Sequence, residues 1–179
     1  MQWVSASSAL IGALIGACVA GFFTLRAKRN EYVNDYFKIV LQKRVEAYEH
    51  LEALIQAYKT TFVDVDNEAY HAPFGSKGLS ENAFALMGPA IESGLWLKDE
   101  TFEVLQKLNY IMFGEPDKDD DRIAFGKKHY REIATLREKL ETRLASDMLE
   151  LHKIARFLKA KKKRALGFHA VRLEHRTKK

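Results

Sequence analysis

The stretch FKIVLQKRVEAYEHLEALIQAYKTTF, residues 37–62, decides the fold class of this chain. Its large apolar side chains recur at every third or fourth position, which is the spacing of one face of an α-helix. They are Phe37, Leu41, Val45, Tyr48, Leu51, Ile55, Tyr58 and Phe62. No glycine or proline occurs between Phe22 and Ala72, so we expect one continuous helix that ends near Phe62.

The same spacing returns near the end of the chain. Residues 122–165 predict a second long helix, which follows the acidic run at 117–121. Its apolar stripe consists of Ile133, Leu136, Leu140, Leu144, Met148, Leu151, Ile154 and Leu158. Two long helices with apolar faces must bury those faces against something, and an antiparallel pair is the simplest arrangement that does so.

Two shorter helices are expected to complete the bundle. The first covers residues 80–93, where Gly88-Pro89 is predicted to bend or break it. The second begins near Asp99 and stops at Gly114-Glu115-Pro116, since acidic first turns and glycine–proline stops mark the two ends of a helix. Residues 63–80 are predicted to form a long loop.

The N-terminal segment WVSASSALIGALIGACVAGFFTL, residues 3–25, contains no ionisable side chain. As a helix it would be about 34 Å long, enough to cross a hydrocarbon core of about 30 Å. A cleaved secretory signal would carry its basic residues before the apolar run, whereas here they follow it. The single cysteine, Cys18, lies in this segment and leaves a lipoprotein-like processing box as an alternative.

The basic residues that follow the apolar segment set its expected orientation. Arg26, Lys28 and Arg29 predict a cytoplasmic domain after the anchor and an external N-terminus. We therefore expect an all-α fold in which a single N-terminal transmembrane helix continues into a cytoplasmic antiparallel helical bundle of two long and two shorter helices. The expected parts are an anchor at 1–29, a helical domain at 30–165 and a basic tail at 166–179, with a bacterial inner membrane as the location.

Small residues recur every fourth position in the predicted anchor and form two neighbouring rows. The candidate helix-association residues are Ser8, Gly12, Gly16 and Ala20 in one row, and Ala9, Ala13, Ala17 and Gly21 in the other. Small rows let two membrane helices approach closely, so we expect a homo-oligomer or a partner's membrane helix. The alternative is that glycine and alanine are simply common in membrane helices.

Charge is distributed unevenly along the chain. Residues 1–29 carry a net charge of +3, residues 30–151 carry −8 and residues 152–179 carry +10, which together give the overall +5. An antiparallel last helix would bring its basic end back to the bilayer, where basic clusters attract anionic headgroups. The candidate lipid or polyanion contacts are Arg26, Lys28, Arg29, Lys159, Lys161, Lys162, Lys163 and Arg164. A solvated basic tail is the alternative.

No motif of known chemistry is present in the sequence. The acidic run at 117–121 fails as a calcium loop, because its sixth position is Arg122 and its twelfth is Lys128. The run beginning at Asp64 fails in the same way, and the six histidines lack metal-site spacing. We therefore predict no catalytic, cofactor-binding or metal-ligating residue, and no enzyme.

These observations predict a non-enzymatic, membrane-anchored interaction or scaffold protein, or an accessory subunit, that self-associates through its anchor. The alternative function is a module that tethers anionic lipid or nucleic acid through the basic C-terminal segment. We expect membrane lipids as partners, and we do not expect nucleic acid, because no recognised binding fold accompanies the basic residues.

Overall fold

The computed structural model describes residues 2–161, with side chains from Gly16 onward. The chain forms two compact units, Met1–Val40 and Leu41–Lys179. Helix α1, Gln2–Ala57, provides the described part of the first unit and enters the second. The other elements are β1 Thr61–Val63, β2 Ala69–His71, the 3-10 helix η1 Ala72–Phe74, α2 Lys77–Glu92, the 3-10 helix η2 Ser93–Trp96, α3 Asp99–Phe113, α4 Asp119–Leu149 and α5 Ile154–Lys161.

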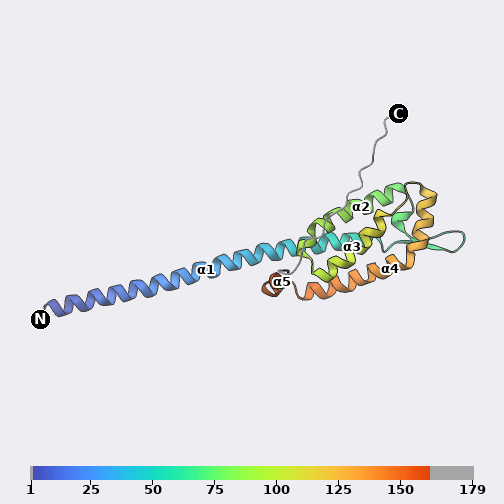
Figure 1. Cartoon of the computed structure of the whole chain (residues 1–179). Coiled ribbons are helices and arrows are strands. Elements are labelled where there is room, and N and C mark those ends of the chain that lie inside the picture. The colour runs from blue at the N-terminus through green and yellow to red at the C-terminus, as the bar shows by residue number, and fades with distance from the viewer. Residues whose placement is uncertain (1, 162–179) are drawn as a thin grey trace, which may run out of the picture. The chain divides into compact units, whose positions relative to one another are not determined.

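Five α-helices within residues 2–161 confirm the prediction of a mainly helical bundle. In the second unit, α2, α3 and α4 gather around the C-terminal part of α1 (Figure 1). The contacts between α1 and α4 run in opposite directions along the two helices, since Tyr48 meets Asp147 whereas Lys59 meets Glu141. The predicted antiparallel pairing of the two long helices is therefore present.

The predicted transmembrane helix is not supported. Among the residues open to description, no helix combines the length and the apolar character needed to cross a bilayer. Much of the predicted span, residues 3–15, has side chains that lie outside the described part of the chain.

The core of the second unit draws on every helix from α1 to α4. The stripe predicted on α1 is buried at Tyr48, Leu51, Ile55 and Tyr58, as helical periodicity requires. Fully enclosed side chains from the other elements include Phe74, Leu97, Leu105, Met112, Ile133 and Leu140. This core holds the ends of α1, α3 and α4 in fixed positions beside one another.

Helix α1 ends at Ala57 rather than near Phe62, and a β-hairpin over residues 61–71 follows it. The rest of the predicted loop at 63–80 contains η1 and the start of α2. Strands β1 and β2 pair antiparallel, with Phe62 opposite Tyr70. Asn67 adopts a left-handed φ of 61°, and the Asp64 carboxylate accepts the backbone N–H groups of Asp66 and Glu68. An aspartate that bonds its own turn in this way stabilises a tight reversal.

The predicted break at Gly88-Pro89 does not occur. Helix α2 runs from Lys77 to Glu92 with Pro89 inside it, and the Ser76 hydroxyl caps its start by accepting the Leu79 N–H. A proline normally clashes with the Cβ of the preceding residue when that residue is helical. Gly88 has no Cβ, which removes this clash, and the helix continues through Pro89.

The predicted single helix over 122–165 is wrong. Helix α4 ends at Leu149, the chain turns over residues 150–153, and α5 follows as a separate helix. The turn leaves Met148 45% exposed while Ile154 and Phe157 become buried. The turn buries these two apolar side chains and lets Arg44 donate a hydrogen bond to the Leu151 carbonyl. Both interactions favour the turn over a continued helix.

Acidification should destabilise the protein through His71. This side chain is 1% exposed, and its Nε2 lies 3.3 Å from the Tyr130 carbonyl oxygen. Burial lowers the pKa of His71, so the unfolded chain binds its proton more readily and the stabilising contribution is lost as pH falls below the ordinary histidine range. Between pH 7 and pH 5, denaturant unfolding should show a larger loss of unfolding free energy for the wild type than for His71→Gln. His152 is exposed, so His152→Gln should lose as much unfolding free energy as the wild type. Equal losses in all three proteins would mean that His71 is not the cause of the acid destabilisation.

Candidate functional site

Two polar residues interrupt the apolar face of α1 inside the second unit. Arg44 and Tyr48 are four residues apart, which places them on the same side of the helix. Both face the C-terminal end of α4, where Arg44 Nη1 donates to the Leu151 carbonyl at 3.0 Å and the Tyr48 hydroxyl donates to Asp147 at 2.7 Å. Their exposed fractions are only 1% and 2%.

Asp147 is the centre of a buried polar cluster. Its Oδ2 accepts hydrogen bonds from the Tyr48 hydroxyl and, at 2.6 Å, from the Thr101 hydroxyl, while Oδ1 lies 2.8 Å from Lys98 Nζ. Burial, followed by the hydrogen bond to Asp147, raises the pKa of Tyr48, an effect that Lys98 and the nearby Arg44 oppose. Tyr48 therefore stays protonated and donates to Asp147, and the cluster ties α1, α3 and α4 together.

Glu150, the residue that caps α4, extends this cluster toward the surface. The hydrogen bonds from Lys153 and Lys98, each at 2.8 Å, lower the pKa of Glu150 to about 2. For Lys98, burial lowers the pKa, but the bonds to Asp147 and Glu150 outweigh it and the net shift is upward. Both groups therefore remain charged at neutral pH.

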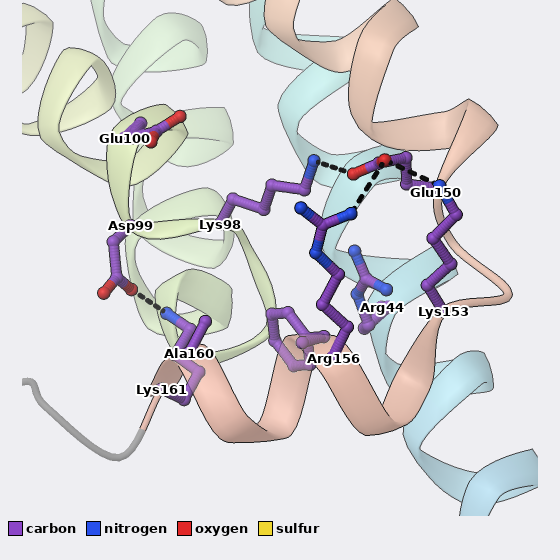
Figure 2. A pocket seen from close by; sticks show the side chains of 10 residues that line it. Arg44, Lys98, Asp99, Glu100, Glu150, Lys153, Arg156, Ala160 and Lys161 are labelled. Atoms are coloured by element: carbon purple, nitrogen blue, oxygen red, sulfur yellow. Dashed lines mark hydrogen bonds and ion pairs between the residues drawn. The ribbon is translucent and has the colours of Figure 1, made fainter.

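A pocket of about 310 Å³ opens beside this cluster, between the start of α3, the α4–α5 turn and α5 (Figure 2). Its lining includes five cations and three carboxylates among ten residues. They are Arg44, Lys98, Asp99, Glu100, Glu150, Lys153, Arg156, Phe157, Ala160 and Lys161. All of them belong to the second unit.

Arg44 is the most buried charge in the pocket lining. Its guanidinium carbon lies 4.1 Å from the centre of the Phe157 ring, a favourable position for a cation over an aromatic face. Within residues 16–161, Arg44 Nε and Nη2 have no hydrogen-bond partner, and no carboxylate lies within ion-pair distance of the guanidinium. A guanidinium is always charged, so this residue of the pocket lining keeps two buried donor nitrogens without a partner among the described residues.

The structure places the candidate helix-association residues only in part. Ser8, Ala9, Gly12 and Ala13 lie outside the residues whose side chains are described. Ala17 and Ala20 are exposed, and a Cβ built on Gly16 or Gly21 would meet nothing within 4 Å. These positions are therefore unobstructed within their own unit, and their role in association remains a prediction.

The candidate basic contacts fall into groups that differ in structure. Arg26, Lys28 and Arg29 are exposed on α1 in the first unit, and Lys159 is exposed on α5 in the second. Lys161 is instead turned into the pocket, where it lies 2.7 Å from Asp99 and its side chain is 13% exposed. Lys162, Lys163 and Arg164 lie outside the described residues.

Of the residues that line this pocket, the sequence patterns predicted a binding role only for Lys161, although a signal for Arg44 was available. Arg44 follows Leu41 by three positions and precedes Tyr48 by four, so this charged residue lies on the apolar face of the helix. Asp147 likewise stands three residues after Leu144 and four before Leu151. Opposite charges within the facing stripes of two antiparallel helices indicate a buried polar contact between those helices.

The chemistry available at this site is recognition of a negatively charged group. Among the described residues, no group of histidine, cysteine, aspartate or glutamate side chains could hold a metal ion. Comparison with protein-family models, with curated proteins and with solved structures gave no significant match. Any functional assignment therefore rests on this chain's own residues.

Proposed function

We propose that this chain is a non-enzymatic interaction protein, anchored in a bacterial inner membrane by residues 3–25, that associates through the small-residue rows of its anchor and holds a helical bundle on the cytoplasmic side. The bundle serves as a docking surface or an accessory subunit. The absence of charge over residues 3–25 and the basic cluster from Arg26 to Arg29 support the anchor and its orientation.

The observation that carries this proposal is the exposed apolar surface of α1 in the first unit. Its large apolar side chains are between 38% and 76% exposed: Val19, Phe22, Phe23, Leu25, Tyr32, Val33, Tyr36 and Ile39. A lone helix is marginal in water, and contiguous exposed apolar surface marks an interaction site. Lipid around the anchor and a second helix beside it would remove this surface from water.

Replacing both Gly12 and Gly16 with isoleucine should abolish association of the chain in a bilayer, because branched side chains keep the helix backbones apart. Crosslinking or single-molecule counting of the full chain in lipid bilayers measures this. A matched control, Leu10→Ile with Leu14→Ile, alters the large-residue side and should leave the oligomer intact. If the glycine variant keeps the wild-type oligomer, or if the chain is released from membranes by alkaline carbonate, the proposal fails.

The exposed position of Lys159 favours a second candidate function, tethering of anionic lipid through the basic C-terminal segment. Neutralising Lys159, Lys162, Lys163 and Arg164 together would reduce binding to vesicles that contain anionic lipid but would leave the oligomer unchanged. The glycine variant would show the opposite pattern, so the two experiments separate the two functions.

A further inference from the structure

We propose that the pocket between the start of α3, the α4–α5 turn and α5 binds one phosphate group, with Arg44 Nε and Nη2 as its principal donors. This site lies in the second unit and does not depend on the anchor or on helix association. Figure 2 shows Arg44 and Arg156 beside Glu150 and Lys153 at the pocket.

The first argument is the state of Arg44. A guanidinium at 1% exposure should be satisfied by anions or several acceptors, since an unpaired buried charge is costly. Among the described residues, Arg44 Nη1 donates to the Leu151 carbonyl, the guanidinium lies against the Phe157 ring, and the Tyr48 ring is 6.0 Å away, but no carboxylate pairs with it. The remaining two nitrogens form the fork that binds two oxygens of a carboxylate or phosphate side by side.

The second argument is the charge surplus around the pocket. Three carboxylates of the lining are each held by a lysine or arginine: Asp99 by Lys161, Glu100 by Arg143 and Glu150 by Lys98 and Lys153. Arg156 lies 3.7 Å from Glu150, which already has two closer partners. When Asp147 and Arg143, which pair with groups of the lining from outside it, are both included, the count is six cations and four carboxylates, an excess of two positive charges.

The excess of two positive charges at the pocket favours a phosphate group over a carboxylate. A phosphate monoester carries about −1.5 to −2 charges at neutral pH, whereas a carboxylate carries one. The pocket volume of about 310 Å³ lies at the small end of the range for ligand sites. Lys153 and Arg156, both exposed at the rim, add charge where the ligand would enter.

The test is calorimetric titration of the full chain, in a non-ionic detergent at pH 7 and constant ionic strength, with inorganic phosphate against a chloride blank. We expect saturable binding and a rise in the unfolding temperature. Arg44→Lys keeps the charge and the apolar stem but removes the fork, so it should weaken binding at least tenfold. The exposed Arg131→Lys, on the outside of α4, is the matched control and should bind like the wild type.

A second variant keeps the proposal testable if Arg44→Lys unfolds. Glu150 competes for the cations of the pocket, so Glu150→Gln should bind phosphate several-fold more tightly. Absence of saturable binding to the wild type, equal affinity of wild type and Arg44→Lys, or unchanged or weaker affinity of Glu150→Gln would each overturn the proposal.

The phosphate could belong to a soluble molecule or to a lipid headgroup, and two further titrations distinguish these sources. One uses glycerol phosphate, and the other uses phosphatidylcholine vesicles with and without phosphatidic acid. Equal affinity per phosphomonoester group identifies a soluble ligand. Tighter binding to the phosphatidic acid vesicles that is lost in Arg44→Lys identifies a headgroup, and failure of both ligands to bind overturns the site.

Discussion

Replacing Asp147 with alanine should lower the free energy of unfolding by about 3 kcal/mol. The substitution leaves the buried hydroxyls of Tyr48 and Thr101 without their acceptor and removes one of the two acids that hold Lys98. Each buried donor left unsatisfied costs about 1–3 kcal/mol. Denaturant unfolding of the full chain in detergent, followed by circular dichroism, measures the loss.

A matched control lies on the same helix. Glu141 forms an ion pair with Lys59 at 2.7 Å, but the two side chains are 48% and 37% exposed. Exposed pairs contribute about 1 kcal/mol or less, so Glu141→Ala should have a small effect. Asp147→Asn, which keeps one acceptor oxygen, should fall between the two. Equal losses for Asp147→Ala and Glu141→Ala would mean that the buried cluster contributes nothing beyond a surface pair.

Replacing Gly126 with alanine should destabilise the second unit by about 1–3 kcal/mol, although alanine is the better helix former. A Cβ at this position of α4 would lie 2.6 Å from the Cβ of Phe74 and 2.8 Å from its Cγ. These atoms sit next to the backbone of η1, and Phe74 is 0% exposed, so rotation of the side chain cannot remove the clash. Either α4 or η1 has to shift.

Replacing Gly78 with alanine should change the stability in the opposite direction. Gly78 lies in the first turns of α2, where an added Cβ meets nothing within 4 Å. Alanine should therefore stabilise the protein there by about 0.5 kcal/mol through helix propensity and a less flexible unfolded chain. Thermal unfolding of both variants checks the pair. If Gly126→Ala is also stabilising, then α4 and η1 do not pack as closely as described.

Local signals were sufficient for some elements. The acidic first turn at Asp99 and Glu100 and the stop at Gly114 predicted α3 at the boundaries that it has. The apolar stripe of α1 predicted which of its faces is buried. In both cases the deciding interactions lie within one or two turns of the same helix, so residue order alone specifies them.

Other elements depend on contacts between distant residues. Strands β1 and β2 have only three residues each, which is too few to show an alternating pattern in the sequence. The turn-forming Asp64 was a usable local signal for this hairpin. The end of α4 depends on α1, because Arg44 binds the Leu151 carbonyl 107 residues away along the chain. No local feature near Leu149 marks that break.

The sequence by itself determined that this protein is a helical bundle, since periodic apolar residues define helix faces wherever the chain places them. It also determined the uncharged segment at residues 3–25 on which the proposed anchor rests. Only the tertiary structure decided which groups surround Arg44, Asp147 and Glu150 and that a pocket opens beside them. The reason is physical: the energy of a buried charge depends on the groups around it in space, and here those groups come from α1, α3, α4 and α5 and from the turn between the last two.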